Sequence, residues 1–93
     1  MTKSETMKRL SALTRAVALL PDDVDVLDAR VSRVGGLGGH PGVQIAGMNA
    51  DLLEVVAKNV DVPVLASRVD DALRLFVFAK GVEIFCYREE DEE

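Results

Sequence analysis

The side chains of this 93-residue chain that could carry chemistry are few and far apart. His40 is the single histidine, and it lies in the segment Gly39-His40-Pro41-Gly42. A transition-metal site needs further histidine or cysteine ligands, and general acid–base catalysis needs a second group that positions the base. Because the sequence spaces no such group beside His40, we predict an exposed turn residue there, and we assign no catalytic residue and no metal ligand.

A run of glycines at residues 35–39 is the next candidate, because glycine-rich loops can cradle phosphate groups. Such a loop follows a strand and opens a helix, whose N-terminal amides hold the anion. This run leads instead to Pro41 and an apolar strand, and it lacks the lysine of a Walker motif. We therefore predict the tip of a hairpin here and no cofactor, with a recognition loop and a nucleotide site as the alternatives.

Cys86 is the only cysteine, so no disulfide can form within the chain. A reactive thiol needs a histidine or a helix N-terminus beside it, and the sequence places neither near Cys86. We predict a buried thiol that packs as a small hydrophobe.

The first residues contain no apolar run typical of a secretory signal, and no stretch is long and apolar enough to span a bilayer. The cytoplasm is the expected compartment.

The net charge of −5 is concentrated at the C-terminal end. Residues 89–93 are all acidic, and they include Glu89, Glu90 and Asp91. These five of the 16 acidic residues leave 11 acids against 11 lysines and arginines in residues 1–88, so that part has no net charge. We predict one domain over residues 1–88 and an acidic tail over residues 89–93, which is either a solubilising end or an arm that meets a basic patch on a partner.

The elements that must position these residues follow from periodicity and turn signals. The sequence predicts a helix over 4–20, strands over 24–34 and 43–48, a second helix that begins at Asn49 and ends at Asn59 or Asp61, and strands over 62–68, 73–79 and 82–88. Successive strands joined by short turns favour an antiparallel sheet. The expected fold is α+β, with about five strands, two helices and the order α-β-β-α-β-β-β.

Apolar residues at spacings of three and four define the predicted buried stripe of each helix. The stripes are Met7, Leu10, Leu13, Val17 and Leu20 in the first helix and Leu52, Val55, Val56 and Val60 in the second. Ser4 and Asn49 are the expected N-caps. The apolar alternation of the first strand changes phase near Val26 and Leu27, which predicts a β-bulge there.

The last two strands are joined by Lys80-Gly81, a two-residue turn that fixes their register. On one face the register pairs Ala79 with Val82, Val77 with Ile84 and Leu75 with Cys86. On the other face it pairs Phe78 with Glu83, Phe76 with Phe85 and Arg74 with Tyr87. All four aromatic residues of the protein therefore lie on one face of this hairpin, and the opposite face is apolar as well.

Four exposed rings would exceed the apolar patch that a monomer tolerates, so something must cover the aromatic face. Both helices could pack on it, one helix could pack on each face, or the aromatic face could be a homodimer or partner interface. In the third case the partner-binding residues are Arg74, Phe76, Phe78, Phe85 and Tyr87, with Glu89, Glu90 and Asp91 steering the partner electrostatically. Aromatic residues on a sheet also stack bases, but the acidic tail cancels the basic field that nucleic-acid binding needs. Neither nucleic acid nor a membrane is an expected partner.

Two motifs carry a resemblance to known proteins. The leading helix ends in Leu20-Pro21-Asp22-Asp23, and the terminal hairpin ends in Gly81-Val82-Glu83-Ile84-Phe85-Cys86-Tyr87 before the acidic tail. This organisation resembles small acidic α+β proteins encoded by phages and mobile elements, some of which are anti-CRISPR-type inhibitors. The resemblance implies a non-enzymatic protein-binding protein that inhibits a host defence complex in the host cell cytoplasm. The alternative is a structural or assembly protein that forms a homodimer through its C-terminal hairpin.

Overall fold

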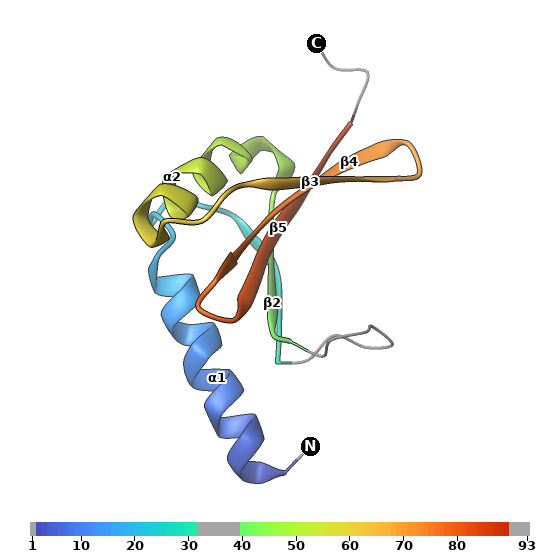
Figure 1. Ribbon diagram of the computed structural model, residues 1–93. Coiled ribbons are helices and arrows are strands. Elements are labelled where there is room, and N and C mark those ends of the chain that lie inside the picture. Colours follow the sequence, from blue (N-terminus) through green and yellow to red (C-terminus); the bar gives the residue numbers. More distant parts are fainter. Residues whose placement is uncertain (1, 32–39, 90–93) are drawn as a thin grey trace.

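The computed structural model describes residues 2–31 and 40–89 (Figure 1). Its elements are α1 (Lys3–Ala18), β1 (Val26–Arg30), β2 (Gly42–Ile45), a short 3-10 helix η1 (Gly47–Asn49), α2 (Asp51–Val60), β3 (Leu65–Val69), β4 (Ala72–Ala79) and β5 (Val82–Glu89). The predicted α+β class, with two helices, five strands and this element order, is confirmed. The glycine run at residues 35–39 and the acidic residues 90–93 lie outside the described residues.

The five strands form one sheet in the order β1-β2-β5-β4-β3. The pairs β1–β2, β3–β4 and β4–β5 are antiparallel, whereas β2 and β5 run parallel, so the sheet is mixed and mostly antiparallel. A parallel pair needs a long crossover, and here α2 and the β3–β4 hairpin supply it. The last strand of the chain therefore lies in the middle of the sheet.

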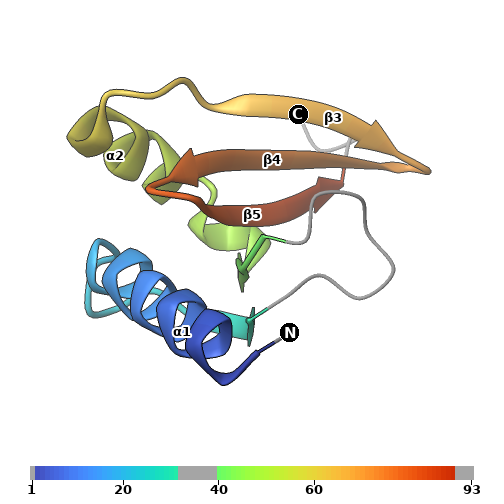
Figure 2. The ribbon, with the colours of Figure 1, turned by 60° about the horizontal axis from the view of Figure 1, so that its bottom comes forward.

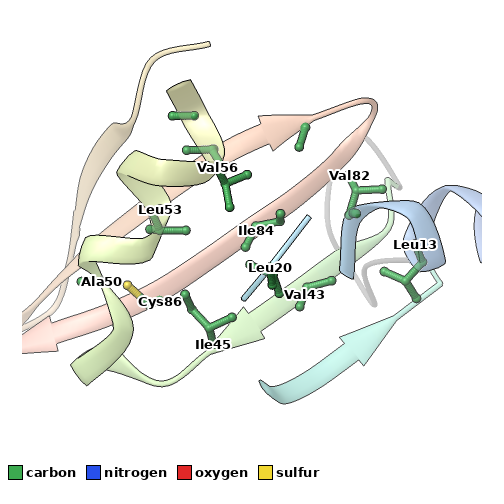
Figure 3. Packing of buried hydrophobic residues seen from close by; sticks show 14 residues of the cluster. Leu13, Leu20, Val43, Ile45, Ala50, Leu53, Val56, Val82, Ile84 and Cys86 are labelled. Carbon is green, nitrogen blue, oxygen red and sulfur yellow. The ribbon is translucent and has the colours of Figure 1, made fainter. Parts of the chain in front are cut away.

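Both helices pack on one face of the sheet, which we call the helix face (Figure 3). Leu13 and Ala16 of α1 and Leu53 and Val56 of α2 belong to one buried cluster with the aliphatic residues of the three central strands. Those strand residues are Val43, Ile45, Val77, Ala79, Val82, Ile84 and Cys86. No aromatic residue belongs to this cluster. The structure thus rules out the two arrangements in which a helix covers the aromatic face.

The first helix begins where Thr2 Oγ1 accepts a hydrogen bond from the Glu5 amide, so the N-cap is Thr2 and not Ser4. The predicted stripe is partly wrong: Leu13 and Leu20 are buried, whereas Met7, Leu10 and Val17 are exposed. Figures 1 and 2 show the reason for Met7 and Leu10, because the N-terminal turns of α1 extend past the sheet. The spacing of apolar residues defines a stripe on a helix, but this spacing does not show how much of the helix the sheet covers.

The second helix buries Leu53, Val56 and Ala57, so of the predicted stripe Val56 is confirmed as fully buried. Val55 is 47% exposed, and the prediction of its burial is wrong. The helix is turned so that the small Ala57 faces the core. It ends at Asp61, one of the two predicted positions, with the left-handed φ of 58° that is frequent after a helix.

Asn49 does not cap the second helix, contrary to our prediction. It belongs to η1, and its Oδ1 accepts a hydrogen bond of 3.2 Å from the Asp25 amide. This bond ties η1 to the chain just before β1. Gly47, the first residue of η1, lies directly against the backbone carbonyl of Tyr87 in β5.

The predicted bulge in β1 is confirmed, because the register with β2 shifts between Val26 and Asp28. Neither helix of the described part is long and apolar enough to cross a membrane.

The β4–β5 hairpin has the predicted register at every pair, from Ala79 with Val82 to Arg74 with Tyr87. Its turn places Lys80 at φ 53° and Gly81 at φ 83°, the two left-handed residues of a type I′ turn. Lysine is disfavoured in this conformation, and asparagine adopts it more readily.

We expect Lys80→Asn to raise the free energy of unfolding by about 0.5–1 kcal/mol, because it relieves backbone strain at the turn. Urea unfolding followed by circular dichroism measures the change. Lys58→Asn, in the right-handed last turn of α2, is the matched control and should give no gain. An equal gain in both variants would contradict an effect of the turn.

Candidate functional site

The sheet face opposite the helix face, which we call the open face, carries the predicted binding residues. Among the described residues it includes Arg74, Phe76 and Phe78 of β4, Phe85, Tyr87 and Glu83 of β5, Leu65, Ser67 and Val69 of β3, Gln44 of β2, and Asp28 and Arg30 of β1. The register places them there, because side chains directly opposite each other share a face. The β3–β5 half is mainly apolar, and the β1–β2 half is polar.

The four rings lie together on the open face, as the sequence predicts. Phe76 and Phe78 meet edge to face at 5.7 Å between centroids, and Phe85 and Tyr87 do so at 5.8 Å. Phe76 and Phe85 are half-buried, whereas Phe78 and Tyr87 are 40% and 39% exposed. The face therefore presents two exposed rings, each supported by a more buried one.

Arg74 lies between two of these rings. Its Cζ is 4.8 Å from the centroid of Phe76 and 4.7 Å from that of Phe85, a double cation–π arrangement. Its Nη2 donates to Oε2 of Glu83 in an ion pair, and only 8% of Arg74 and 2% of Glu83 is exposed. Arg74 thus lies beneath the surface that a partner would meet, where it supports the rings.

Glu83 is the residue at this site whose role the sequence reasoning missed. The register places Glu83 opposite Phe78. An acidic residue among the aromatic residues of this hairpin face was the signal in the sequence that could have indicated a buried ion pair. A buried carboxylate needs a cation and further hydrogen bonds. Arg74 supplies the cation, and His40 lies on its other oxygen.

His40 is not the exposed turn residue that we predicted. Its Nε2 lies 3.3 Å from Oε1 of Glu83, its ring meets Phe78 edge to face at 5.3 Å, and its side chain is mostly buried. The neighbouring backbone explains this position, because the Glu83 amide donates a 3.0 Å hydrogen bond to the Pro41 carbonyl. His40 is thereby held against the sheet, and the edge of its ring forms part of the open face.

A hollow of about 260 Å³ opens on this face where β1, β2 and β5 lie side by side. Asp28 and Arg30 form one wall, joined by a 2.5 Å contact from Arg30 Nε to Asp28 Oδ2, and Phe85 and Tyr87 form the other. Gln44 adds amide groups to its lining. Ligand pockets usually hold about 300–1,000 Å³, so a hollow of this size suits one side chain of a partner better than a cofactor.

Cys86 lies on the helix face and is fully buried, so the prediction of a buried thiol is confirmed. Burial raises the pKa of the Cys86 thiol above its usual value, and the nearby charge of Arg88 lowers it in part. Among the described residues, no three histidine, cysteine or acidic side chains gather closely enough to hold a metal ion.

The acidic residues assigned to partner steering are placed only in part. Glu89 is the last residue of β5, and Glu90 and Asp91 lie outside the described residues. The steering role of all three stays a prediction.

Comparison of the chain with protein-family models, with curated proteins and with solved structures finds no match.

Proposed function

We propose that this chain is a non-enzymatic protein-binding protein that docks a partner on its open face. The observation that carries the proposal is that both helices pack on the helix face while Phe78 and Tyr87 remain about two-fifths exposed on the other. Leu65 and Val69 extend the exposed apolar surface onto β3. Exposed aromatic and apolar side chains rimmed by polar ones are typical of protein interfaces.

The charges beside the open face favour one kind of partner surface. Five consecutive acidic residues begin at Glu89, two positions after Tyr87. The ion pairs Arg74–Glu83 and Asp28–Arg30 are internally balanced, so they add no net charge to the face. A partner surface with an apolar patch flanked by lysines or arginines is therefore complementary, and its basic residues would accelerate association.

We further propose that the partner is a host defence complex and that docking inhibits it, as an anti-CRISPR-type protein would in the cytoplasm of the host cell. The two motifs that resemble small acidic phage and mobile-element proteins support this, and both lie among the described residues: one follows the end of α1, and the other covers most of β5. The alternative is a homodimer formed through the same face of the C-terminal hairpin, for which the exposed rings of Phe78 and Tyr87 are equally suited.

The test is a plaque assay on a panel of bacterial strains, each with one active CRISPR–Cas type targeting the infecting phage. Expression of the chain should restore plaque formation in at least one strain. Phe78→Asp should lower that restoration at least about tenfold, because a charge at the centre of a desolvated interface costs several kcal/mol. Val55→Asp is the matched control, since Val55 is similarly exposed on α2 and lies away from the open face.

The outcomes separate the two versions of the proposal. Restoration that survives Phe78→Asp, in protein whose thermal unfolding is unchanged, would contradict docking on the open face. If no strain is affected, inhibition of CRISPR complexes is wrong. In that case, sedimentation shows whether the chain forms a dimer. A dimer that dissociates in the Phe78→Asp variant and persists in the Val55→Asp variant would identify the homodimer instead.

A further inference from the structure

A second hollow, of about 300 Å³, lies where the middle of α1 faces the turn between β4 and β5. Figure 1 shows this turn beside α1, although the two segments come from opposite halves of the sequence. Lys8 and Arg9 of α1 line the hollow together with Lys80 of the turn and His40. None of the described residues that line it is acidic. We call it the basic hollow. Of its described lining residues, only His40 also lines the hollow on the open face.

The three cationic side chains of the basic hollow have no partner among the residues that the structure describes. No hydrogen bond or ion pair there involves the side chain of Lys8, Arg9 or Lys80. Arg9 is half-buried, and its guanidinium carries N–H donors that need acceptors. Three cations that gather without an acidic group also repel one another. An anion bound in the basic hollow would accept hydrogen bonds from these donors and remove the repulsion.

The charge of α1 is opposite to that of the whole chain. The helix contains four basic residues and one acidic residue, a net charge of +3, whereas the chain carries −5. The acidic residue is Glu5, which lies about one turn before Lys8 and Arg9 and forms no ion pair with either of these described residues. This local excess of positive charge attracts anions to one place on a protein that otherwise repels them.

The backbone of Lys80 is an independent indication that this side chain has a role beyond the fold. Its φ of 53° is left-handed, a conformation that is disfavoured for lysine and in which asparagine is more stable. Residues held in such conformations are frequent at ligand-binding sites, where the function offsets the loss of stability. A lysine at this position places a cation at the basic hollow, which asparagine would not do.

We propose that the basic hollow binds a small ligand through linked phosphate groups, either an inorganic polyphosphate or the phosphate chain of a nucleotide. A single phosphate group carries a charge of only about −1.5 to −2, so three cations match more than one such group. Arg9 can bind phosphate oxygens with two parallel hydrogen bonds, and Lys8 and Lys80 act as point charges beside them. The volume lies at the lower end of the range for ligand pockets, about 300–1,000 Å³, which suits a ligand of this size.

The phosphate site does not depend on the proposed docking of a protein at the open face. Its three cations come from α1 and from the β4–β5 turn, whereas the aromatic residues of the open face lie along β4 and β5. Phe78→Asp, which tests the open face, should therefore leave phosphate binding within about twofold of its original affinity. Each proposal can fail while the other one stands.

Isothermal titration calorimetry with tripolyphosphate tests the site, and ATP without a divalent metal ion is the second probe. At low salt we expect one binding site with a dissociation constant of about 1 mM or tighter. Sulfate at the same ionic strength should bind at least about tenfold more weakly, because its two charges match fewer of the cations. Equal affinities for the two probes would assign recognition to the phosphate chain alone. An ATP affinity at least about tenfold higher would identify a nucleotide as the ligand.

Lys80→Asn is the most informative variant, because it is expected to stabilise the turn while it removes a cation from the basic hollow. It should weaken tripolyphosphate binding at least about tenfold, as expected for the loss of one charged contact. Lys58→Asn removes the same charge from α2, away from the hollow, and should change the affinity less than about twofold. Arg9→Gln should also weaken binding at least about tenfold, with Arg15→Gln on the same helix as its control.

Three results would overturn the proposal. The first is no binding of either probe at about 10 mM, and the second is an equal loss of affinity in Lys80→Asn and Lys58→Asn. The third is an oligothymidylate that binds at least about tenfold more tightly than tripolyphosphate at equal phosphate concentration and depends on Arg15 as much as on Arg9. That result would show that the whole surface of α1 attracts polyanions and that the basic hollow is not a distinct site. Should Lys80→Asn fail to fold, the comparison of Arg9→Gln with Arg15→Gln decides.

Discussion

Replacing Arg74 with alanine is expected to lower the free energy of unfolding by about 3–5 kcal/mol. The substitution leaves the carboxylate of Glu83, only 2% exposed, without the guanidinium that compensates its charge. It also removes the cation between the rings of Phe76 and Phe85. Because a domain of this kind is stable by only about 5–15 kcal/mol, this loss is a large fraction of the total. Urea unfolding at constant pH and salt measures it.

Two further variants show whether the loss arises from the buried charge. In the double variant Arg74→Met with Glu83→Leu, both charges are removed together, and we expect most of the stability to return. Arg30→Ala breaks the exposed Arg30–Asp28 pair on the same face and should cost less than about 1 kcal/mol. If Arg74→Ala costs no more than Arg30→Ala, the pair with Glu83 contributes nothing to the fold.

Gly47→Ala is expected to destabilise the domain by about 3 kcal/mol, at the upper end of the range for overpacking. A Cβ at Gly47 would lie 2.3 Å from the backbone oxygen of Tyr87, far inside van der Waals contact. The clash is with backbone in the middle of the sheet, so no side-chain rotation can relieve it. Either η1 must move away from β5 or β5 must shift against its neighbours. Urea unfolding again gives the change in free energy.

Gly42→Ala is the matched control for that prediction. Its Cβ would lie 3.6 Å from Cε1 of Phe85 and 3.7 Å from the backbone oxygen of Glu83, which is ordinary van der Waals contact. We expect it to change the free energy of unfolding by less than about 1 kcal/mol, since alanine is the better residue for backbone entropy. Equal losses in the two variants would mean that the close approach at Gly47 does not limit stability.

Local features of the chain made the C-terminal hairpin predictable. The turn at Lys80-Gly81 determines which residues of β4 and β5 face each other, and alternation then gives the faces. The position of the β1 bulge likewise follows from a change of phase within a few residues. The gathering of all four rings on one face was therefore readable from sequence, and it is the basis of the candidate site.

Long-range features were not predictable in the same way. Glu83 meets His40 across 43 positions of sequence, and no local pattern indicates that contact. The exposure of Met7 depends on the length of the sheet beneath α1, which is set by strands formed elsewhere in the chain. Which sheet face the helices would cover was also open, because the hairpin is apolar on both sides.

The central position of β5 has a consequence for how the protein is made. The β1–β2 and β3–β4 pairs are joined into one sheet only by β5, the last strand to be synthesised. A ribosome adds about 5–20 residues per second, so roughly 2–9 s pass between the synthesis of β2 and that of β5. Throughout that interval Val43 and Ile45 have no neighbour on the β5 side. A nascent-chain chaperone that shields them should raise the yield of folded protein.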